Sequence, residues 1–585
     1  MRRKVLSVLI LASALFLMSG CNSKSKYQEE LTIDVFASEA NSQGIQSGWF
    51  ARRIHDRFNM NLNVISINNN YNGAVLKDVR AASGYLGDII FISAQNNALK
   101  DLVDAGLLLD MTPYIKDKDI MKYKDAIEKL NSGLDGIYAI PSSISTLPPD
   151  TPSDIIDSTY APYLRWDIYS QVGRPKMDTL EDMLDVLEKM QEAYPTTQSG
   201  QKVYGFSLFD DWDNNMMTLA KQPCCFYGYD ENGFVLSKAD GSDYQSILDD
   251  DGLYLRSLKF YFEANRMGLV DPDSRNQDYG EVFSKYQDGA VLFSPWPFLG
   301  ASAYNTDEHM AMGQGFMMAD IGDMLIYEHG SSPDGVYSQV VCVGADVKDP
   351  QRMVDFVDYL YSDEGVYENQ AAENGGSAGP EGVTWEMSDG APRLTDYGID
   401  VFYNQSSGVI PGDPNGYTYR DGVSILNYTA VQLSETAANG FPYSYLLWDS
   451  ELSRTSTVLQ DEWKEVMGAD NTMDYLIKND KIIVSPGCEY NEMEESAEIK
   501  EIREAVKRIV VQGSWDMVFA SDIDEFEAIW DDMKRKCMSL GYEDVYSFDL
   551  DNDMAKGKLK HEIMEDKRKY QERYMQDCKI SVMIS

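Results

Sequence analysis

The chain has 585 residues, and its 51 Lys and Arg against 95 Asp and Glu give a formal net charge of −44. A field this negative repels a phosphate backbone, which excludes nucleic-acid binding. The hydrophobic fraction of 43% and the charged fraction of 25% are those of a soluble globular chain, which argues against disorder and against a multi-span membrane protein.

Residues 1–20 have the pattern of an export signal: a basic start, an apolar run at 5–18 and small residues before Cys21. The apolar run is too short to span a bilayer comfortably. Residues 17–21 (LMSGC) resemble the bacterial lipobox, and this resemblance implies that Cys21 is lipidated and becomes the new N-terminus. We expect a lipoprotein signal peptide at 1–20 and a polar tether at 21–30, held at the membrane by two acyl chains.

Strands and helices are expected to alternate over the first hundred residues. Apolar residues alternate or run continuously in some segments and recur at helical spacing in others. Strands are predicted at 31–37, 63–67 and 88–93, and helices at 47–58 (capped by Ser47), 72–83 and 97–105. This alternation with short connections predicts an α/β lobe with right-handed crossovers.

Elements further along the chain are more scattered. Residues 141–162 are rich in Pro, Ser, Thr and Asp, which predicts a long surface excursion. A capping box at Thr179 and Asp182 predicts a helix start. A strand is expected at 203–209, helices at 253–266, 353–361 and through most of the last hundred residues, where Ser521 is predicted to cap a helix ended by Gly541.

Motifs of catalysis and metal binding are imperfect. Residues 375–379 match G-x-S-x-G, but a polar segment precedes them and Pro380 follows, whereas a nucleophile elbow needs a strand before and a helix after. The four histidines do not pair at zinc spacing, and the six cysteines after the lipobox define no disulfide framework. The acidic run 549–553 begins like a calcium loop, but Met554 and Lys560 replace its Gly and Glu, so we expect a solvated acidic turn. We predict no catalytic residue, metal ligand or cofactor.

Seven short motifs follow one another in order along residues 31–400. They are 87–93 (GDIIFIS), 99–110, 136–141 (GIYAIP), 267–272 (MGLVDP), 288–296 (DGAVLFSPW), 349–365 and 379–385 (GPEGVTW). Their order and spacing resemble the extracellular solute-binding proteins of family 1, the sugar-binding lipoproteins of ABC importers. The resemblance implies a two-lobed, periplasmic-binding-protein-like (type II) α/β fold with a hinge, a saccharide ligand and no enzymatic activity.

The resemblance also suggests how the chain divides. Lobe 1 is expected from residues 31–140 and 335–390. Lobe 2 is expected from 141–334 and 391–485, and residues 486–585 are expected to form a helical C-terminal extension.

A sugar offers flat C–H faces and a rim of hydroxyls, so its site needs aromatic rings and hydrogen-bonding side chains. Trp296 follows a strand-like segment, and in the maltose-binding relatives the matching Pro-Trp stacks on a sugar ring. The resemblance therefore implies that Trp296 binds ligand. Asp211, Trp212 and Asp213 come directly after the expected strand 203–209, where open α/β sheets place ligands.

Further ligand-binding residues are expected from both lobes. Asp88 matches a family carboxylate, and Gln95 and Asn96 follow the same strand. Arg165 opens a segment similar to the family's R-x-D-W-L, with Ile168 in place of the tryptophan. The resemblance adds Glu381 and Trp385 from the 379–385 motif.

The expected protein is thus a monomeric carbohydrate-binding lipoprotein at the extracellular or periplasmic face of the cell membrane. Its expected partners are an oligosaccharide or other small polar ligand, the permease subunits of an ABC transporter and, through the lipid anchor, the membrane. A peptide receptor on the same scaffold is one alternative. A surface glycoside hydrolase is another, because 95 acidic residues supply many carboxylate pairs whose separation the sequence does not give.

Overall fold

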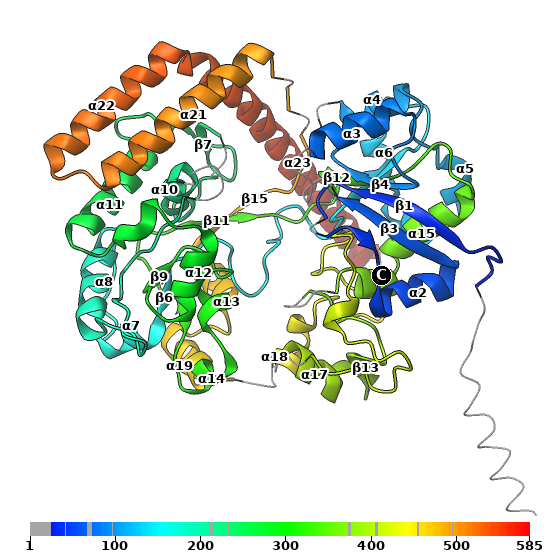
Figure 1. Ribbon diagram of the computed structural model, residues 1–585, viewed down its shortest axis with the longest axis horizontal. Helices are drawn as coiled ribbons and strands as arrows, with labels where there is room; N and C mark the ends of the chain where they lie inside the picture. The colour runs from blue at the N-terminus through cyan, green and yellow to red at the C-terminus, as the bar shows by residue number, and fades with distance from the viewer. Residues whose placement is uncertain are drawn as a thin grey trace, which may run out of the picture. The chain divides into compact units, whose positions relative to one another are not determined.

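The computed structural model describes residues 25–40, 42–66, 73–95, 97–210, 216–230, 233–371, 376–403, 407–452, 456–490, 492–493 and 495–584. The chain divides into two compact units (Figure 1). Unit 1 draws on Met1–Ser142, Tyr337–Leu433 and Ala437–Tyr445, and unit 2 on Ser143–Val336, Ser434–Thr436 and Leu446–Ser585. The divisions after residues 142 and 336 lie close to the expected ones after 140 and 334.

A six-stranded sheet forms the centre of unit 1. Its strands are β1 (Leu31–Ala37), β2 (Gly44–Ile45), β3 (Met60–Ser66), β4 (Ile89–Ile92), β5 (Ala139–Ser142) and β12 (Val336–Val343), in the order β2-β3-β1-β4-β12-β5. Strand β1 pairs in parallel with β3 and β4, whereas β12 runs antiparallel to β4. All four residues of β4 are buried, as a continuous apolar run in a central strand should be. The predicted α/β architecture is confirmed.

Helices cover both faces of this sheet (Figure 1). The helices of unit 1 are α2 (Gly48–Phe58), α3 (Gly73–Ala82), α4 (Ala98–Asp104), α5 (Thr112–Ile115), α6 (Lys124–Leu130), α15 (Pro350–Tyr361), α16 (Asp363–Asn369) and α17 (Asp396–Phe402). The unit also contains a hairpin of β13 (Trp385–Ser388) and β14 (Ala391–Leu394) and the 3-10 turns η1 (Asp119–Tyr123) and η3 (Arg420–Gly422). Helix α2 buries Trp49, Phe50, Ile54 and Phe58, the stripe that its sequence predicts.

Residues 391–433 belong to unit 1, although we expected them in the second lobe. Trp49 of α2 stacks on Tyr419 with ring centroids 5.9 Å apart, and its indole N–H donates to the Tyr419 carbonyl oxygen at 2.9 Å. Gly422 allows this contact, because a Cβ there would lie 2.2 Å from the Trp49 ring. Such long-range aromatic packing leaves no periodic signal in the sequence.

Residues 25–30, here called the strap, pack on unit 1, which corrects the expectation of a free tether. The Tyr27 hydroxyl donates to the Asp355 carboxylate. The Arg352 guanidinium lies over the Tyr27 ring, 4.3 Å from its centroid. The Asn59 side-chain amide donates to the Tyr27 carbonyl oxygen at 3.2 Å. The polar composition of the strap concealed these contacts, because they are made by one aromatic ring and by backbone carbonyls.

Unit 2 is richer in helices. Strands β10 (Phe316–Met318), β6 (Tyr163–Arg165) and β9 (Phe293–Ser294) form one antiparallel sheet, β11 (Ile326–His329) pairs in parallel with β15 (Ile482–Ser485), and β7 (Val235–Ser237) pairs with β8 (Tyr244–Ser246). The helices are α7 (Trp166–Gln171), α8 (Asp182–Ala193), α10 (Met216–Cys225), α11 (Leu253–Arg266), α12 (Tyr279–Gln287), α13 (Gly300–Tyr304), α14 (Asp307–Ala311), α18 (Asp449–Leu452), α19 (Val458–Met467), α20 (Thr472–Lys478), α21 (Ala497–Val518), α22 (Ile523–Leu540) and α23 (Tyr542–Ile584), with the 3-10 turns η2 (Pro272–Arg275) and η4 (Tyr445–Leu447).

The strand expected at 203–209 does not form a regular ladder. Tyr204 makes a single parallel bridge with Val291, and Phe206 makes another with Val270. The segment therefore lies between two different partners and pairs with each at one residue, which apolar alternation alone does not distinguish from a strand.

Two predicted helix starts are shifted by a few residues. Helix α8 begins at Asp182, whose carboxylate accepts a hydrogen bond from the Thr179 backbone N–H at 2.9 Å. Helix α22 is capped by Asp522, which accepts from the Glu525 N–H at 2.9 Å, and not by Ser521.

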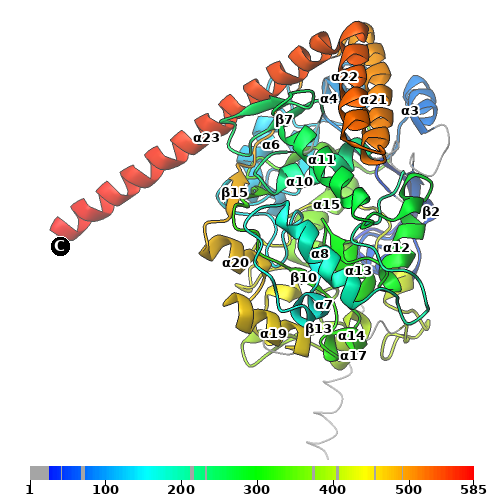
Figure 2. The same cartoon turned by 90° about the vertical axis from the view of Figure 1, so that its left-hand side faces the viewer.

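The C-terminal region is helical, as predicted, and it packs within unit 2. Helices α21 and α22 lie side by side, and α23 continues as one long helix (Figure 2). The Tyr254 hydroxyl of α11 lies 2.8 Å from the Ser514 hydroxyl of α21. The acidic run 549–553 is part of α23 and not a turn, because Asp549 pairs with Arg503 of α21 at 2.9 Å.

Cys224, Cys342 and Cys537 are buried and form no disulfide. Burial raises the pKa of the Cys224 thiol to about 12, so it is unreactive at neutral pH. Within the described ranges, no helix is long and apolar enough to cross a bilayer.

Candidate functional site

Trp296 lies in a loop of unit 2 between β9 and α13. The Ser294 hydroxyl donates to the Trp296 carbonyl oxygen at 2.8 Å and accepts from the Gly300 N–H at 3.2 Å. Gly300 is required, because a Cβ there would lie 2.7 Å from the Ser294 Cβ. Prolines on both sides of Trp296 fix its neighbouring backbone angles. The loop thus holds the indole in one place.

The Trp296 side chain belongs to the hydrophobic core of unit 2 and is only 3% exposed. The Phe298 ring stacks on it, with ring centroids 5.1 Å apart and planes 19° apart. Phe298 is 43% exposed. The ring that offers an open face at this place is therefore Phe298, which the sequence analysis missed. Its one signal is its position two residues after Trp296 in the S-P-W-P-F segment.

Further aromatic rings pack around this pair: Phe209 is buried, whereas Tyr279 and Phe283 are partly exposed. Phe209 lies 6.5 Å from Trp296 and 5.5 Å from Tyr279, and Tyr279 lies 6.0 Å from Phe283, centroid to centroid. Tyr279 and Phe283 are four residues apart on α12 and so share one face. We call the set Phe209, Tyr279, Phe283, Trp296 and Phe298 the aromatic platform. The cavity beneath it measures about 10 Å³, which is too small for a sugar.

A chain of buried hydrogen bonds supports the platform. The Gln277 amide donates to the Ser207 hydroxyl at 2.8 Å, and Ser207 donates to the Asp271 carboxylate at 2.8 Å. The Asp210 N–H donates to the Gln277 carbonyl oxygen at 3.1 Å. These bonds hold the segment 206–210 against the start of α12. The half-buried Asp210 therefore stands beside the platform, while Asp211, Trp212 and Asp213 lie outside the described residues.

Arg165 is buried. Its guanidinium makes two hydrogen bonds to Asp167, at 3.0 and 2.8 Å, and one to the Gly289 carbonyl oxygen at 3.3 Å. It also lies over the Tyr304 ring, 3.9 Å from the centroid. These contacts give Arg165 a packing role.

The residues expected around β4 do not come together. Asp88 precedes the strand, where its carboxylate accepts from the Asp34 N–H at 2.8 Å and from the Tyr85 hydroxyl at 2.9 Å. Gln95 follows the strand, so the two lie at opposite ends of β4. Only Gln95 is at the carboxyl end, where open α/β sheets bind ligands. Asn96 lies outside the described residues.

Glu381 and Trp385 belong to unit 1. Trp385 is buried against Tyr367, 4.8 Å between ring centroids, and its indole N–H donates to the Gly379 carbonyl oxygen at 2.8 Å. Glu381 is exposed on the same turn. Trp385 therefore holds the turn, and Glu381 is the member of this pair that can reach a ligand.

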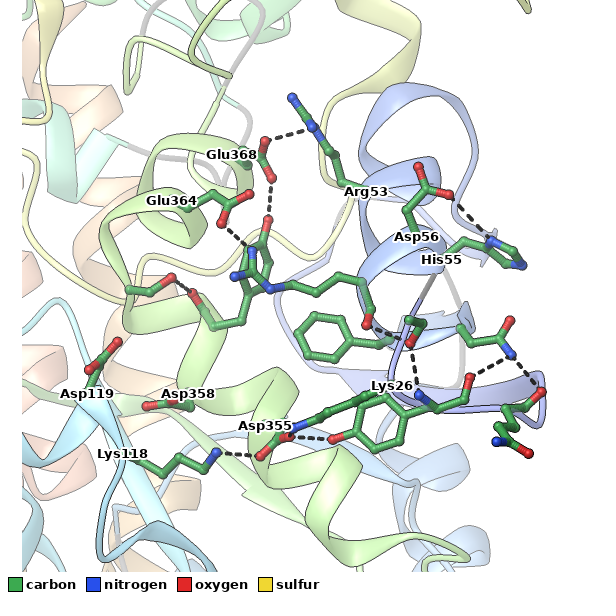
Figure 3. Close-up of a pocket in the computed structure, with 18 residues that line it drawn as sticks. Lys26, Arg53, His55, Asp56, Lys118, Asp119, Asp355, Asp358, Glu364 and Glu368 are labelled. Atoms are coloured by element: carbon green, nitrogen blue, oxygen red, sulfur yellow. Dashed lines mark hydrogen bonds and ion pairs between the residues drawn. The ribbon is translucent and has the colours of Figure 1, made fainter. Parts of the chain in front are cut away.

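A hollow of about 1110 Å³ in unit 1 lies between the strap, α2, α15 and α16 (Figure 3). Its charged side chains pair with one another: Lys26 and Lys118 with Asp355, Arg57 with Glu364, and Arg53 with Glu368 at 3.0 Å. Each of these cations has a carboxylate partner, so the hollow is lined mainly by ion pairs.

In the described part of the chain, no three His, Cys, Asp or Glu side chains are grouped so that they could hold a metal ion.

No protein-family model and no curated relative matches the sequence. Solved structures do match it over 92% of the chain. The alginate-binding protein AlgQ2 has a TM-score of 0.57 at 15% identity, with 99% of its own chain covered. The substrate-binding protein FusA of an ABC transporter from S. pneumoniae, solved with kestose, has a TM-score of 0.56 at 15% identity and is covered completely (100%). An extracellular solute-binding protein from Bifidobacterium longum subsp. infantis has a TM-score of 0.51 at 13% identity, also with 100% covered.

These similarities cover almost all of each chain, including the helical C-terminal region. They agree with the sequence motifs found in order along residues 31–400. The chain has the periplasmic-binding-protein-like α/β fold of the ABC-transporter solute-binding proteins.

Proposed function

We propose that the protein is a lipid-anchored, extracellular oligosaccharide-binding protein that delivers its ligand to an ABC-type importer. The observation that carries this proposal is the aromatic platform of unit 2. Phe298 offers an exposed ring over Trp296, and the half-buried Asp210 follows Phe209 of the platform, so we propose its carboxylate as a contact. Aromatic faces next to hydrogen-bonding groups match the C–H faces and hydroxyls of a sugar.

Two further observations support this ligand class. The structures that share the fold include proteins named for binding alginate and solved with kestose. Gln95, at the carboxyl end of β4, and the exposed Glu381 are polar side chains of unit 1 that we propose as additional contacts.

Burial excludes Glu328 as the catalytic acid of a glycoside hydrolase. A catalytic acid needs a raised pKa, and burial beside Asp154 raises the pKa of Glu328 to about 8. The residue is, however, only 1% exposed. A carboxyl so enclosed cannot reach a glycosidic oxygen, so its raised pKa reflects burial and not catalysis.

Binding is tested by a thermal-shift screen with neutral oligosaccharides, uronate oligosaccharides and short peptides. A ligand at about 100 times its dissociation constant stabilises the protein by about 2.7 kcal/mol, which is readily measured. Stabilisation by an oligosaccharide without its turnover on prolonged incubation supports the proposal. Stabilisation by peptides alone would show that the ligand is a peptide and not a sugar. Hydrolysis of an oligosaccharide on prolonged incubation would show that the protein is a glycoside hydrolase.

The anchor is tested separately by fatty-acid labelling. The wild-type protein should incorporate labelled fatty acid and partition with membranes, and a Cys21→Ser variant should do neither. Equal labelling of both proteins would refute lipidation at Cys21.

A further inference from the structure

The strap is fixed to unit 1 from its first described residue. The Ser25 hydroxyl donates to the Arg57 carbonyl oxygen at 2.8 Å and accepts from the Tyr27 N–H at 3.2 Å. Lys26 and Tyr27 both bind the Asp355 carboxylate (Figure 3).

The rest of the strap is held equally firmly. Arg352 donates to the Glu29 carbonyl oxygen at 2.7 Å. The side-chain amide of Asn61 donates to the Glu30 carboxylate at 2.7 Å. The strap therefore has partners along its length, and its start is held at the C-terminal part of α2.

From this attachment we infer that the face of unit 1 formed by the strap and residues 53–59 of α2 lies against the phospholipid head groups. We call it the strap face. The inference rests on the proposed lipidation of Cys21. Only four residue steps separate Cys21 from Ser25, and they span at most about 14 Å in any conformation. A free tether through residue 30 would reach more than twice as far.

The head-group layer of the bilayer takes up part of this reach. Head groups occupy roughly 5 to 8 Å on each side of the hydrocarbon core, and the acyl chains of Cys21 must enter that core. About 6 to 9 Å of chain is then left above the head groups before Ser25 meets Arg57. The strap face of unit 1 is therefore held close to the membrane, and the other faces of unit 1 point away from it.

The exposed groups of the strap face suit this partner. Lys26, Arg53 and Arg57 each pair with a carboxylate, and all three remain partly exposed. Cationic side chains that keep unused N–H groups can donate to lipid phosphates. Within residues 25–30 and 53–59 the three cations balance Glu29, Glu30 and Asp56, so these two segments are formally neutral in a chain of net charge −44.

Photocrosslinking of the full-length, lipidated protein in bacterial membranes tests this orientation. Benzoylphenylalanine is incorporated in place of Asp56 on α2, which is 69% exposed, or in place of Lys100 on α4, which is 57% exposed. Figure 1 shows α2 and α4 on opposite sides of the central sheet of unit 1. With phosphate-labelled lipids, position 56 should give a labelled adduct and position 100 should give none above background.

A second variant lengthens the chain without disturbing the strap. Fifteen Gly and Ser residues inserted after Ser23 add a flexible reach of about 20 Å, and the adduct at position 56 should then fall to the level at position 100. Equal adducts at both positions, or an unchanged adduct after insertion, would overturn the orientation. Fatty-acid labelling of the same samples separates the two proposals, since its absence refutes the anchor and this inference with it.

Discussion

Phe298 stacks on Trp296 with 5.1 Å between ring centroids, and the two rings have different roles in the aromatic platform. Trp296 is buried among core side chains, whereas Phe298 presents its outer face to solvent. A buried indole that supports an exposed phenyl ring gives a rigid aromatic surface. Its affinity for a sugar should therefore depend on Phe298, and its position should depend on Trp296.

Substituting Phe298 should change mainly the affinity for oligosaccharide, and substituting Trp296 should change mainly the stability of the fold. Phe298→Ala should weaken oligosaccharide binding by about 1 to 3 kcal/mol, as stacking on flat rings is worth, and should leave the melting temperature nearly unchanged. Trp296→Ala should lower stability by roughly 3 to 5 kcal/mol, because it empties a core position. Calorimetric titration and melting curves of both variants check this. Wild-type affinity of the Phe298→Ala variant would show that the aromatic platform does not bind the oligosaccharide.

The strap should contribute to the stability of unit 1. Tyr27→Ala removes the ring beneath Arg352 and the hydroxyl bonded to Asp355, and should cost about 1 to 3 kcal/mol. Tyr27→Phe keeps the ring and should lose only part of this. Gln28→Ala is the matched control, since that side chain is exposed. Denaturant unfolding of a soluble protein lacking residues 1–21 measures the differences. Equal stability of Tyr27→Ala and Gln28→Ala would contradict a packed strap.

Glu328 should make stability depend on pH. Burial raises its folded-state pKa from 4.5 to about 8. Between these two values the folded protein holds a proton that the unfolded chain has lost, so stability falls as pH rises through this window. Glu328→Gln cannot ionise and should raise the melting temperature at pH 8 by a few degrees, with little effect near pH 4.5. Glu188→Gln, at an exposed position of α8, controls for the lost charge. If Glu328→Gln changed the melting temperature by the same amount at both pH values, the raised pKa of Glu328 would be refuted.

The sequence predicted the elements that local patterns determine and missed the contacts that only packing creates. Strand β1 and helix α11 match their predicted bounds, because alternation and helical spacing are visible in the residues themselves. The contact between Trp49 and Tyr419 and the docking of Tyr27 join segments hundreds of residues apart. For the site, the family motif led to Trp296, but only the structure distinguishes the buried ring from the exposed ring of Phe298.

The charge around the platform should select an uncharged ligand. The structure brings together segments 206–210, 277–284 and 293–304, which contain Asp210, Asp278 and Glu281 and no Lys or Arg. The nearest cation along α12, Lys285, is paired with Asp271 at 2.7 Å. A carboxylated sugar would meet like charge here without a compensating cation.

Matched oligosaccharides that differ in charge test this selection. Maltotetraose, nystose and N-acetylchitotetraose should include at least one binder, and tetragalacturonate and a mannuronate tetramer should bind at least tenfold more weakly, which is a difference of about 1.4 kcal/mol. Asp210→Asn should narrow the difference in affinity between neutral and uronate oligosaccharides, because it removes a carboxylate next to the platform. High salt should narrow this difference less than the substitution does. Calorimetric titration at fixed ionic strength gives the affinities. Uronate binding as tight as that of the neutral sugars would show that the cations for an acidic ligand come from outside these three segments, and would refute the selection proposed for the platform.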